Sequence, residues 1–218
     1  METVKIIAIL SVLIVPMLAY GSGVTRHKYI IVAALEQETA NAGLEQYAPI
    51  VYTGVGKVNA AINLYDAILK YQPDLVINYG TAGSVNGKTG LYHIDTFIQF
   101  DMDTRPLGTP RGVTPFSEKQ LPEANGIVLG TGDSFMVDAD RQLEGLAIPI
   151  DLVDMEGYAL NKVCDHLNVE FHCYKNVSDS ANSDASEDWS TNVSNGVTLF
   201  KEMLHNKYGI SQLTAGTK

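Results

Sequence analysis

The sequence predicts a single α/β domain with three layers, α/β/α, built around a mixed, mainly parallel central sheet. Short apolar segments of strand type alternate along the chain with segments of helical periodicity. This alternation is expected where parallel strands are joined by helices that cover both faces of a sheet. The 218 residues contain no internal repeat and no linker, and that length suits one domain with a sizeable core.

The first half of the predicted domain supplies two strands and a helix. Residues 29–35 (YIIVAAL) form a short apolar run that is typical of a buried strand. Residues 57–71 are predicted as an amphipathic helix that ends before Pro73. Residues 75–78 form the next strand, and residues 80–83 (GTAG) are predicted as a tight, glycine-permitted loop.

The second half continues the alternation with four strands and two helices. The predicted strands are residues 94–100, 126–129, 148–153 and 170–177. The predicted helices are residues 155–167 and a closing helix over most of residues 189–206. Long loops are predicted at residues 101–120 and 178–190, which are rich in turn-forming residues, and a turn at residues 130–133.

The first 23 residues differ from the rest of the chain. Lys5 is followed by the uncharged apolar run 6–19 and then by the small residues 21–23, an order typical of a secretory signal peptide. The run is shorter than the ~20 residues of a spanning helix, although an uncleaved N-terminal anchor is an alternative. We therefore predict a leader at residues 1–23 and a domain at residues 24–218. The domain would be periplasmic or secreted, with no stable membrane partner after cleavage.

The composition excludes several kinds of partner. The chain carries 15 Lys and Arg against 25 Asp and Glu, a net charge of −10, and has no Lys/Arg run, which argues against nucleic acid binding. The five histidines show no metal-ligand spacing, so we expect no metal and no cofactor. Export permits a disulfide between Cys164 and Cys173, but their places in a predicted helix and a buried strand favour two free thiols.

Polar residues collect where the predicted strands end. Glu38 follows the first strand, Thr81 the second of the first half, Glu156 a late strand and Asp179 the last strand. Ligands of open α/β sheets bind beyond the carboxyl ends of the strands, so these four residues are expected to converge. Each of them alone also suits a structural role, such as a glutamate at the start of a helix.

Seven short motifs occur along the chain in the same order as in a known protein family. They are IVAALEQE (31–38), GVGKV (54–58), PD (73–74), NYGTAG (78–83), TGDSF (131–135), VDME (153–156) and VSD (177–179). From about residue 30 to residue 197 the chain resembles the nucleoside phosphorylase/nucleosidase superfamily, and most of all the 5′-methylthioadenosine/S-adenosylhomocysteine nucleosidases. The resemblance implies a nucleoside phosphorylase-like fold, a small-molecule nucleoside substrate and a homodimer.

The resemblance also implies roles for individual residues in cleaving the N-glycosidic bond of a purine nucleoside. Asp179, oriented by Ser178, would protonate the leaving base, and Glu38 would hold and activate the attacking water. Glu156 would accept hydrogen bonds from both ribose hydroxyls, since a carboxylate has two acceptor oxygens, and Phe135 would stack on the base. The remaining substrate-binding residues implied by these motifs are Thr81, Ala82, Gly83, Val153 and Met155.

The chain departs from this family at four places, one of which, residues 100–108, resembles a different subgroup of the superfamily. The segment between Glu38 and Thr53 is shorter than in the nucleosidases, and it lacks a region that in the family helps to build the dimer and the pocket. Lys175 stands where the family carries an arginine, and Trp189 where it carries a phenylalanine in a flap. These departures affect the pocket for the 5′-substituent, whereas the acid–base pair is present.

The superfamily contains both hydrolases and phosphorylases, and residues 33–38 favour hydrolysis. This segment (AALEQE) lacks the arginine of the phosphorylase motif, and the carboxylate of Glu38 would repel a phosphate dianion. The alternatives are a purine nucleoside phosphorylase and a non-catalytic storage or binding member of the fold. The presence of both Glu38 and Asp179 favours an enzyme over the second alternative.

Overall fold

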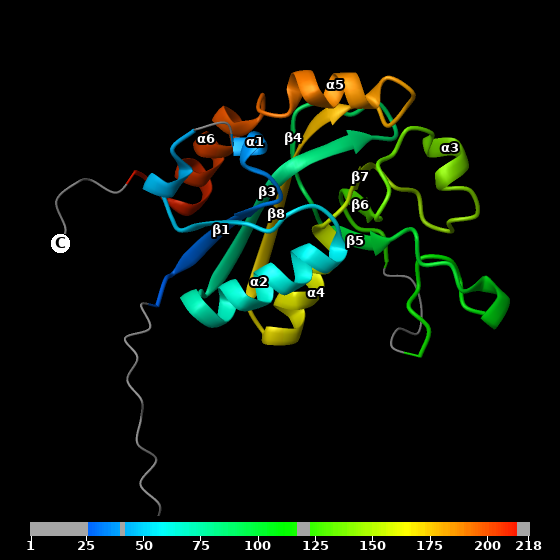
Figure 1. Ribbon diagram of the computed structural model, residues 1–218, viewed down its shortest axis with the longest axis horizontal. Helices are drawn as coiled ribbons and strands as arrows, with labels where there is room; N and C mark the ends of the chain where they lie inside the picture. Colours follow the sequence, from blue (N-terminus) through cyan, green and yellow to red (C-terminus); the bar gives the residue numbers. More distant parts are fainter. Residues whose placement is uncertain (1–25, 40–41, 117–122, 213–218) are drawn as a thin grey trace, which may run out of the picture.

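A computed structural model describes residues 26–39, 42–116 and 123–212. These residues form an eight-stranded sheet with helices on both of its faces (Figure 1). The predicted leader, residues 1–23, lies outside the described ranges, so the division of the chain into leader and domain stays a prediction. Within those ranges, no helix has the length and apolar character needed to cross a membrane.

The strands of the sheet are β1 (Tyr29–Ala33), β2 (Ile50–Tyr52), β3 (Leu75–Ser84), β4 (Leu91–His93), β5 (Thr96–Gln99), β6 (Val128–Thr131), β7 (Leu152–Asp154) and β8 (Glu170–Asp179). The strands β3 and β8 have ten residues each, and the other six have three to five. The α-helices are α1 (Glu36–Thr39), α2 (Lys57–Tyr71), α3 (Ala139–Gln142), α4 (Gly157–Leu167), α5 (Ala185–Asn192) and α6 (Val197–Tyr208). Single 3-10 turns lie at Leu44–Gln46 and Arg105–Leu107.

The pairing of the strands confirms the predicted mixed, mainly parallel sheet. The main order is β2-β1-β3-β7-β6-β5, and β8 pairs with both β3 and β4. Five pairs are parallel: β1 with β2, β1 with β3, β3 with β8, β5 with β6, and β6 with β7. The pairs β3–β7 and β4–β8 are antiparallel. The parallel strands β1, β3 and β8 therefore end at the same edge of the sheet.

The core has one cluster on each face of the central strands. On β1, Ile30 and Val32 pack with α2 and α4, whereas Ile31 points to the opposite cluster, which contains Phe200 and Leu204 of α6. Successive side chains of a strand point to opposite faces, so a strand that is apolar throughout is covered on both sides. Figure 1 shows α2 and α4 on one side of the sheet and α6 on the other.

The structure corrects the prediction of a loop at residues 80–83. These residues continue β3, which runs through Ser84 and is buried along nearly its whole length. Gly80 and Gly83 serve close approach rather than a turn: an added Cβ would lie 3.0 Å from Glu38 Oε1 at Gly80 and 2.7 Å from Asp179 Oδ1 at Gly83. The two glycines allow carboxylates to lie directly against the strand.

The C-terminal region also differs from the prediction. Ser178 and Asp179 belong to β8 rather than to a loop, and α5 begins inside the predicted loop 178–190 and ends at Asn192. The predicted closing helix 189–206 is two helices, α5 and α6, separated at residues 193–196. Gly196 lies so close to Asn176 that a Cβ would meet its side chain at 2.2 Å. This close approach occurs at the residue where the chain turns into α6.

Several short elements were not predicted, and some predicted bounds were too wide. The strands β2 and β4 have three residues each and the helices α1 and α3 four each, which is too short to show a period. The strand predicted at residues 148–153 begins only at Leu152, and the strand predicted at 94–100 spans Thr96–Gln99. The helix predicted at residues 57–71 has the same bounds in the structure.

Candidate active site

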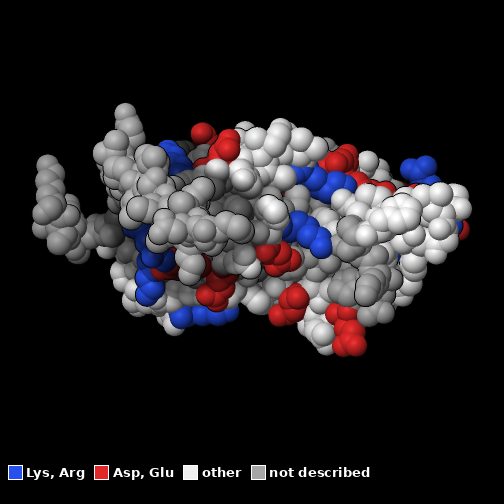
Figure 2. Space-filling model, turned by 90° about the horizontal axis from the view of Figure 1, so that it is seen from below, with Lys and Arg blue, Asp and Glu red and all other residues white. Residues whose placement is uncertain are grey.

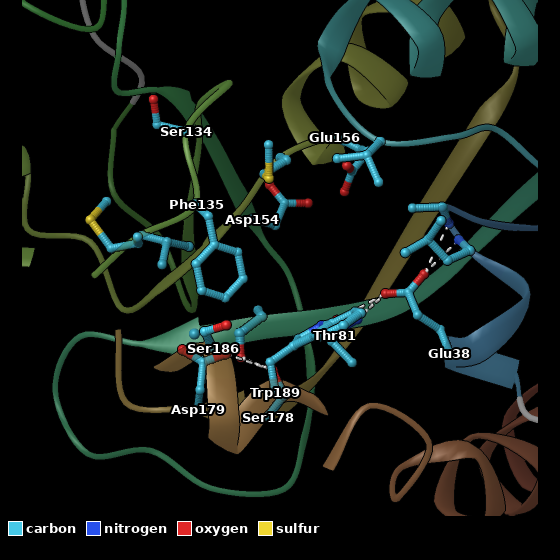
Figure 3. A pocket seen from close by; sticks show the side chains of 18 residues that line it. Glu38, Thr81, Ser134, Phe135, Asp154, Glu156, Ser178, Asp179, Ser186 and Trp189 are labelled. Carbon is cyan, nitrogen blue, oxygen red and sulfur yellow. Dashed lines mark hydrogen bonds between the residues drawn. The ribbon is translucent and has the colours of Figure 1, made fainter. Parts of the chain in front are cut away.

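A cavity of about 320 Å³ lies where β1, β3 and β8 end. Its volume is within the range of small-molecule sites, and its place at the carboxyl ends of parallel strands is where α/β sheets bind ligands. All ten residues that the sequence singled out line it: Glu38, Thr81, Ala82, Gly83, Phe135, Val153, Met155, Glu156, Ser178 and Asp179. Figure 3 shows Glu38 and Asp179 approaching the cavity from opposite sides and Glu156 approaching it from a third side.

Glu38 is held rigidly by four hydrogen bonds. Its Oε2 accepts from the backbone N–H groups of Ala34 (3.0 Å) and Leu35 (3.1 Å), just beyond β1. Its Oε1 accepts from the backbone N–H of Thr81 (2.7 Å) and from the Thr81 hydroxyl (2.9 Å) on β3. Four donors match the acceptor capacity of an ionised carboxylate. The side chain is therefore fixed in place as a buried anion that faces the cavity.

Asp179 is aimed into the cavity by an irregularity in β8. The register of β3 and β8 shifts between Ala82 and Gly83, so Asp179 rather than Ser178 lies opposite Gly83. Asp179 Oδ2 accepts from the Ser178 hydroxyl at 2.8 Å, and Oδ1 accepts from the backbone N–H of Ala181 at 2.9 Å. Burial raises the pKa of Asp179 despite these hydrogen bonds. Such a carboxyl can hold a proton to donate.

Glu156 enters from the start of α4 and is tied to the loop before α2. Its Oε1 accepts from the backbone N–H of Gly56 at 3.0 Å. Burial, together with the nearby carboxylate of Asp154, raises the pKa of Glu156 to about 7, against the opposing effects of Lys175 and the Gly56 N–H. The glycine-rich segment 54–57 thus binds a carboxylate of the protein itself.

A buried ion pair lies beside these carboxylates. Lys175 Nζ lies 2.9 Å from Asp154 Oδ2, and Asp154 also accepts from the Thr131 hydroxyl (2.6 Å) and the Gly157 N–H (2.8 Å). Burial by itself would lower the pKa of Lys175, but Asp154 and the other acidic groups around it raise the pKa above its usual value. The lysine that stands in place of the family's arginine is thus a protonated partner for the buried acidic groups.

The sequence missed eight residues of the cavity wall as binding residues. They are Ala34, Leu35, Val55, Ser134, Met136, Asp154, Ser186 and Trp189. Several of them neighbour a predicted residue in the chain, so the motifs could have indicated them. Ser186 comes from the part of α5 that was predicted as a loop, whereas Trp189 was named for its place in the flap but not as a binding residue. Phe135, the proposed base-stacking residue, is 42% exposed and borders the cavity.

The described residues contain no group of three or more His, Cys, Asp or Glu arranged to hold a metal ion. Cys164 and Cys173 are free and buried, as predicted. Burial raises the pKa of both thiols to about 12, so both stay protonated. On the face shown in Figure 2, the described Lys and Arg side chains are interspersed with Asp and Glu. That face offers no continuous basic surface for a phosphate backbone.

Four carboxylates from three parts of the chain, around a cavity at the strand ends, define a class: an α/β protein with a site for a small molecule. The chain belongs to the phosphorylase superfamily, because the family model of that description matches residues 44–206.

Individual relatives and structures agree with this family. A 5′-methylthioadenosine/S-adenosylhomocysteine nucleosidase of Staphylococcus aureus is 31% identical over 160 residues, 62% of this chain and 70% of that protein. The structure of the nucleosidase of that name from Helicobacter pylori has a TM-score of 0.71 at 20% identity and covers 84% of this chain and 98% of the other. A futalosine hydrolase mutant of Helicobacter pylori has a TM-score of 0.70 at 19% identity, with coverage of 82% and 98%. At these identities the two structures show the fold.

Proposed function

We propose that the protein is an N-glycosyl hydrolase that cleaves the bond between base and ribose in a purine nucleoside such as 5′-methylthioadenosine. Its 31% identity to a 5′-methylthioadenosine/S-adenosylhomocysteine nucleosidase supports this substrate class. Cleavage passes through a ribosyl cation with oxocarbenium character, so the leaving base needs a proton and the cation needs a water. Asp179 and Glu38, on opposite sides of the cavity, are suited to these two tasks.

Asp179 is proposed as the general acid that protonates the purine. The raised pKa caused by its burial favours the protonated form that this step requires. The Ser178 hydroxyl, 2.8 Å from Oδ2, orients the carboxyl. Phe135 stands beside the space for the base, where an aromatic ring can stack on a purine.

Glu38 is proposed as the base that receives a proton from the attacking water. Its carboxylate is buried, and its four hydrogen bonds fix its position relative to β1 and β3. Glu156 is proposed as the ribose ligand. Only its Oε1 accepts a hydrogen bond from the described residues, from Gly56, so the carboxylate has acceptor capacity left for sugar hydroxyls.

The charge of the cavity wall is the observation that favours hydrolysis over phosphorolysis. Among the described residues that line it, the charged side chains are Glu38, Asp154, Glu156 and Asp179, and none is Lys, Arg or His. Lys175 lies beneath the wall and is paired with Asp154. A phosphate dianion would be repelled in such a site of low dielectric constant, whereas a water molecule would not.

The experiment that tests an enzymatic function is incubation of the protein with adenosine, inosine and 5′-methylthioadenosine, followed by chromatography of the free bases. We expect release of a purine from at least one nucleoside and loss of that release in Glu38→Gln. Binding of a nucleoside without any release of base would instead indicate the storage or binding alternative.

We also propose a homodimer, on the basis of an exposed apolar stripe on α2. Val58, Ile62, Tyr65 and Leu69 are 68%, 57%, 40% and 54% exposed and repeat at intervals of four, three and four residues, which places them on one helix face. Exposed apolar patches of this kind mark association sites, and a helix stripe can pair with its own copy about a two-fold axis. Sedimentation at micromolar concentration should show a dimer and Ile62→Glu a monomer; a monomeric wild type would reject the dimer.

Export is proposed on the sequence of residues 1–23 alone. Mass spectrometry of the natively expressed protein should give a mature N-terminus near residues 20–24. An intact Met1 in a cytosolic fraction would contradict this proposal.

A further inference from the structure

The Thr81 hydroxyl is the one movable donor among the four that hold Glu38. The other three are backbone N–H groups, fixed by β3 and by the turn after β1. A hydroxyl has a single proton that rotates about the C–O bond, and its oxygen can accept further hydrogen bonds. The direction of the Thr81 proton therefore depends on what the Thr81 oxygen accepts.

That oxygen accepts a hydrogen bond from a tryptophan on another element. Trp189 Nε1 on α5 donates to Thr81 Oγ1 at 3.1 Å, across 108 positions of the sequence. The indole N–H is a donor only, so it occupies a lone pair of Oγ1 and leaves the Thr81 proton for Glu38, whose Oε1 lies 2.9 Å away. Trp189, Thr81 and Glu38 thus form one directed chain of hydrogen bonds (Figure 3).

The helix that carries Trp189 is fixed at the other end of the cavity. Asn192 Nδ2 donates to the backbone oxygen of Ser178 at 2.9 Å, beside Asp179. Trp189 and Asn192 are three residues apart, which places them on neighbouring parts of one helix face. Through these two contacts α5 connects the strand end that carries Asp179 with the donor group of Glu38.

We propose, on the basis of the function proposed above, that Trp189 is a positioning residue for Glu38 and acts through the Thr81 hydroxyl. When Glu38 accepts a proton from water, one of its four donors has to give way, and only the Thr81 hydroxyl can rotate. Because the indole donates to Oγ1 whichever way the hydroxyl proton points, it keeps this oxygen in place before and after the proton moves. The Thr81 oxygen can then accept a hydrogen bond from the protonated Glu38.

The test is a double-mutant cycle on kcat and KM for 5′-methylthioadenosine. Trp189→Phe keeps an aromatic ring over the cavity but removes the N–H. A single neutral hydrogen bond corresponds to about 3- to 10-fold in rate, so we expect kcat to fall by about that factor with KM within about 2-fold of wild type. In a Thr81→Val background the same change should cost less than about 2-fold, because the hydroxyl that it positions is absent.

Two further variants complete the cycle. Thr81→Ser keeps a hydroxyl, so Trp189→Phe should cost as much in that background as in the wild type. Ser190→Ala removes a hydroxyl from an exposed position of α5, where it donates to the Glu187 carbonyl, and kcat should not change. Trp189 is the only tryptophan of the chain, so an emission spectrum in Thr81→Ser that matches the wild type would verify that the indole has not moved.

Three outcomes would overturn the positioning role. Trp189→Phe could keep the wild-type kcat, or it could change KM alone. The third outcome is that the losses in kcat of Trp189→Phe and Thr81→Val multiply in the double variant. Glu38→Gln separates this result from failure of the proposed function. If Glu38→Gln keeps full activity, the assignment of the base is wrong. If it loses activity while Trp189→Phe does not, only the positioning role is wrong.

Discussion

Lys175 and Asp154 form an ion pair of 2.9 Å from which solvent is almost wholly excluded, their side chains being 2% and 1% exposed. The pair lies next to Glu156, whose carboxylate raises the pKa of the lysine further. A buried lysine among carboxylates compensates charge that water cannot reach. The Lys175–Asp154 pair therefore allows acidic side chains to line the cavity without leaving uncompensated negative charge in the core beneath it.

Removal of the cation should destabilise the fold. In Lys175→Met the buried carboxylate of Asp154 loses its partner, which costs about 3–5 kcal/mol in the free energy of unfolding. The second change in Lys175→Met/Asp154→Asn removes the unpaired charge and should restore a large part of this loss. Urea denaturation measures both variants. Equal losses in the single and the double variant would show that the unpaired charge is not the cause.

Glu156→Gln should stabilise the fold in a pH-dependent way. The pKa of Glu156 is about 7 in the folded protein, above its ordinary value of 4.5. The folded state therefore binds a proton more tightly than the unfolded chain, and this group makes the protein less stable as the pH rises from about 4.5 to 7. Above pH 7 the folded state holds a buried anion at full cost, and the neutral amide removes that cost.

We expect Glu156→Gln to be more stable than the wild type by about 1–3 kcal/mol near pH 8, a rise in Tm of several degrees. The gain should shrink towards about pH 5. Glu202→Gln, at an exposed position of α6, is the matched control and should show no such trend. A gain that is the same at both pH values would indicate that the charge of Glu156 is not its source.

The sugar specificity should depend on the same residue. If Glu156 accepts hydrogen bonds from both ribose hydroxyls, a 2′-deoxynucleoside leaves one buried acceptor unpaired, at a cost of ~1.5–3 kcal/mol, or roughly 10- to 100-fold in kcat/KM. Deoxyribosides form the oxocarbenium ion more easily, which masks part of this penalty. The comparison is therefore the ribo/deoxy ratio of wild type against Glu156→Gln. The ratio should shrink in the variant, and an unchanged ratio would remove Glu156 from the ribose site.

Asp179→Asn should fold normally and lose nearly all activity. The amide is close in size to the carboxyl but has no acidic proton, and general acid catalysis contributes ~10²–10⁴-fold. Circular dichroism verifies the fold, and single-turnover release of adenine measures the loss. Activity within a few-fold of the wild type would place the acid elsewhere.

The sequence predicted the long elements because their patterns are local. The helix α2 alternates buried and exposed positions over fifteen residues, and β1 is a continuous apolar run. Short strands such as β2 and β4 show no periodic pattern in the sequence. Pairing with β1 and β8, rather than a local pattern, holds them in place. The glycines of β3 were wrongly predicted as turn residues. The carboxylates that approach them are distant in the sequence, so no pattern near the glycines indicates the contact.

The cavity residues were predictable by their places at strand ends, but their mutual contacts were not. No pattern in the sequence links Lys175 to Asp154, or Trp189 on α5 to Thr81 on β3. Such contacts arise only when the sheet brings separate segments together. The folded arrangement also raises the pKa of Glu156, first through burial and then through the nearby carboxylate of Asp154.

Hydrolysis is tested most directly by the identity of the sugar product formed from 5′-methylthioadenosine with and without inorganic phosphate. The acidic wall of the cavity predicts adenine and free 5-methylthioribose, at a rate that added phosphate does not change. A rate that depends on phosphate, with 5-methylthioribose 1-phosphate detected by phosphorus NMR, would contradict hydrolysis and establish the protein as a phosphorylase.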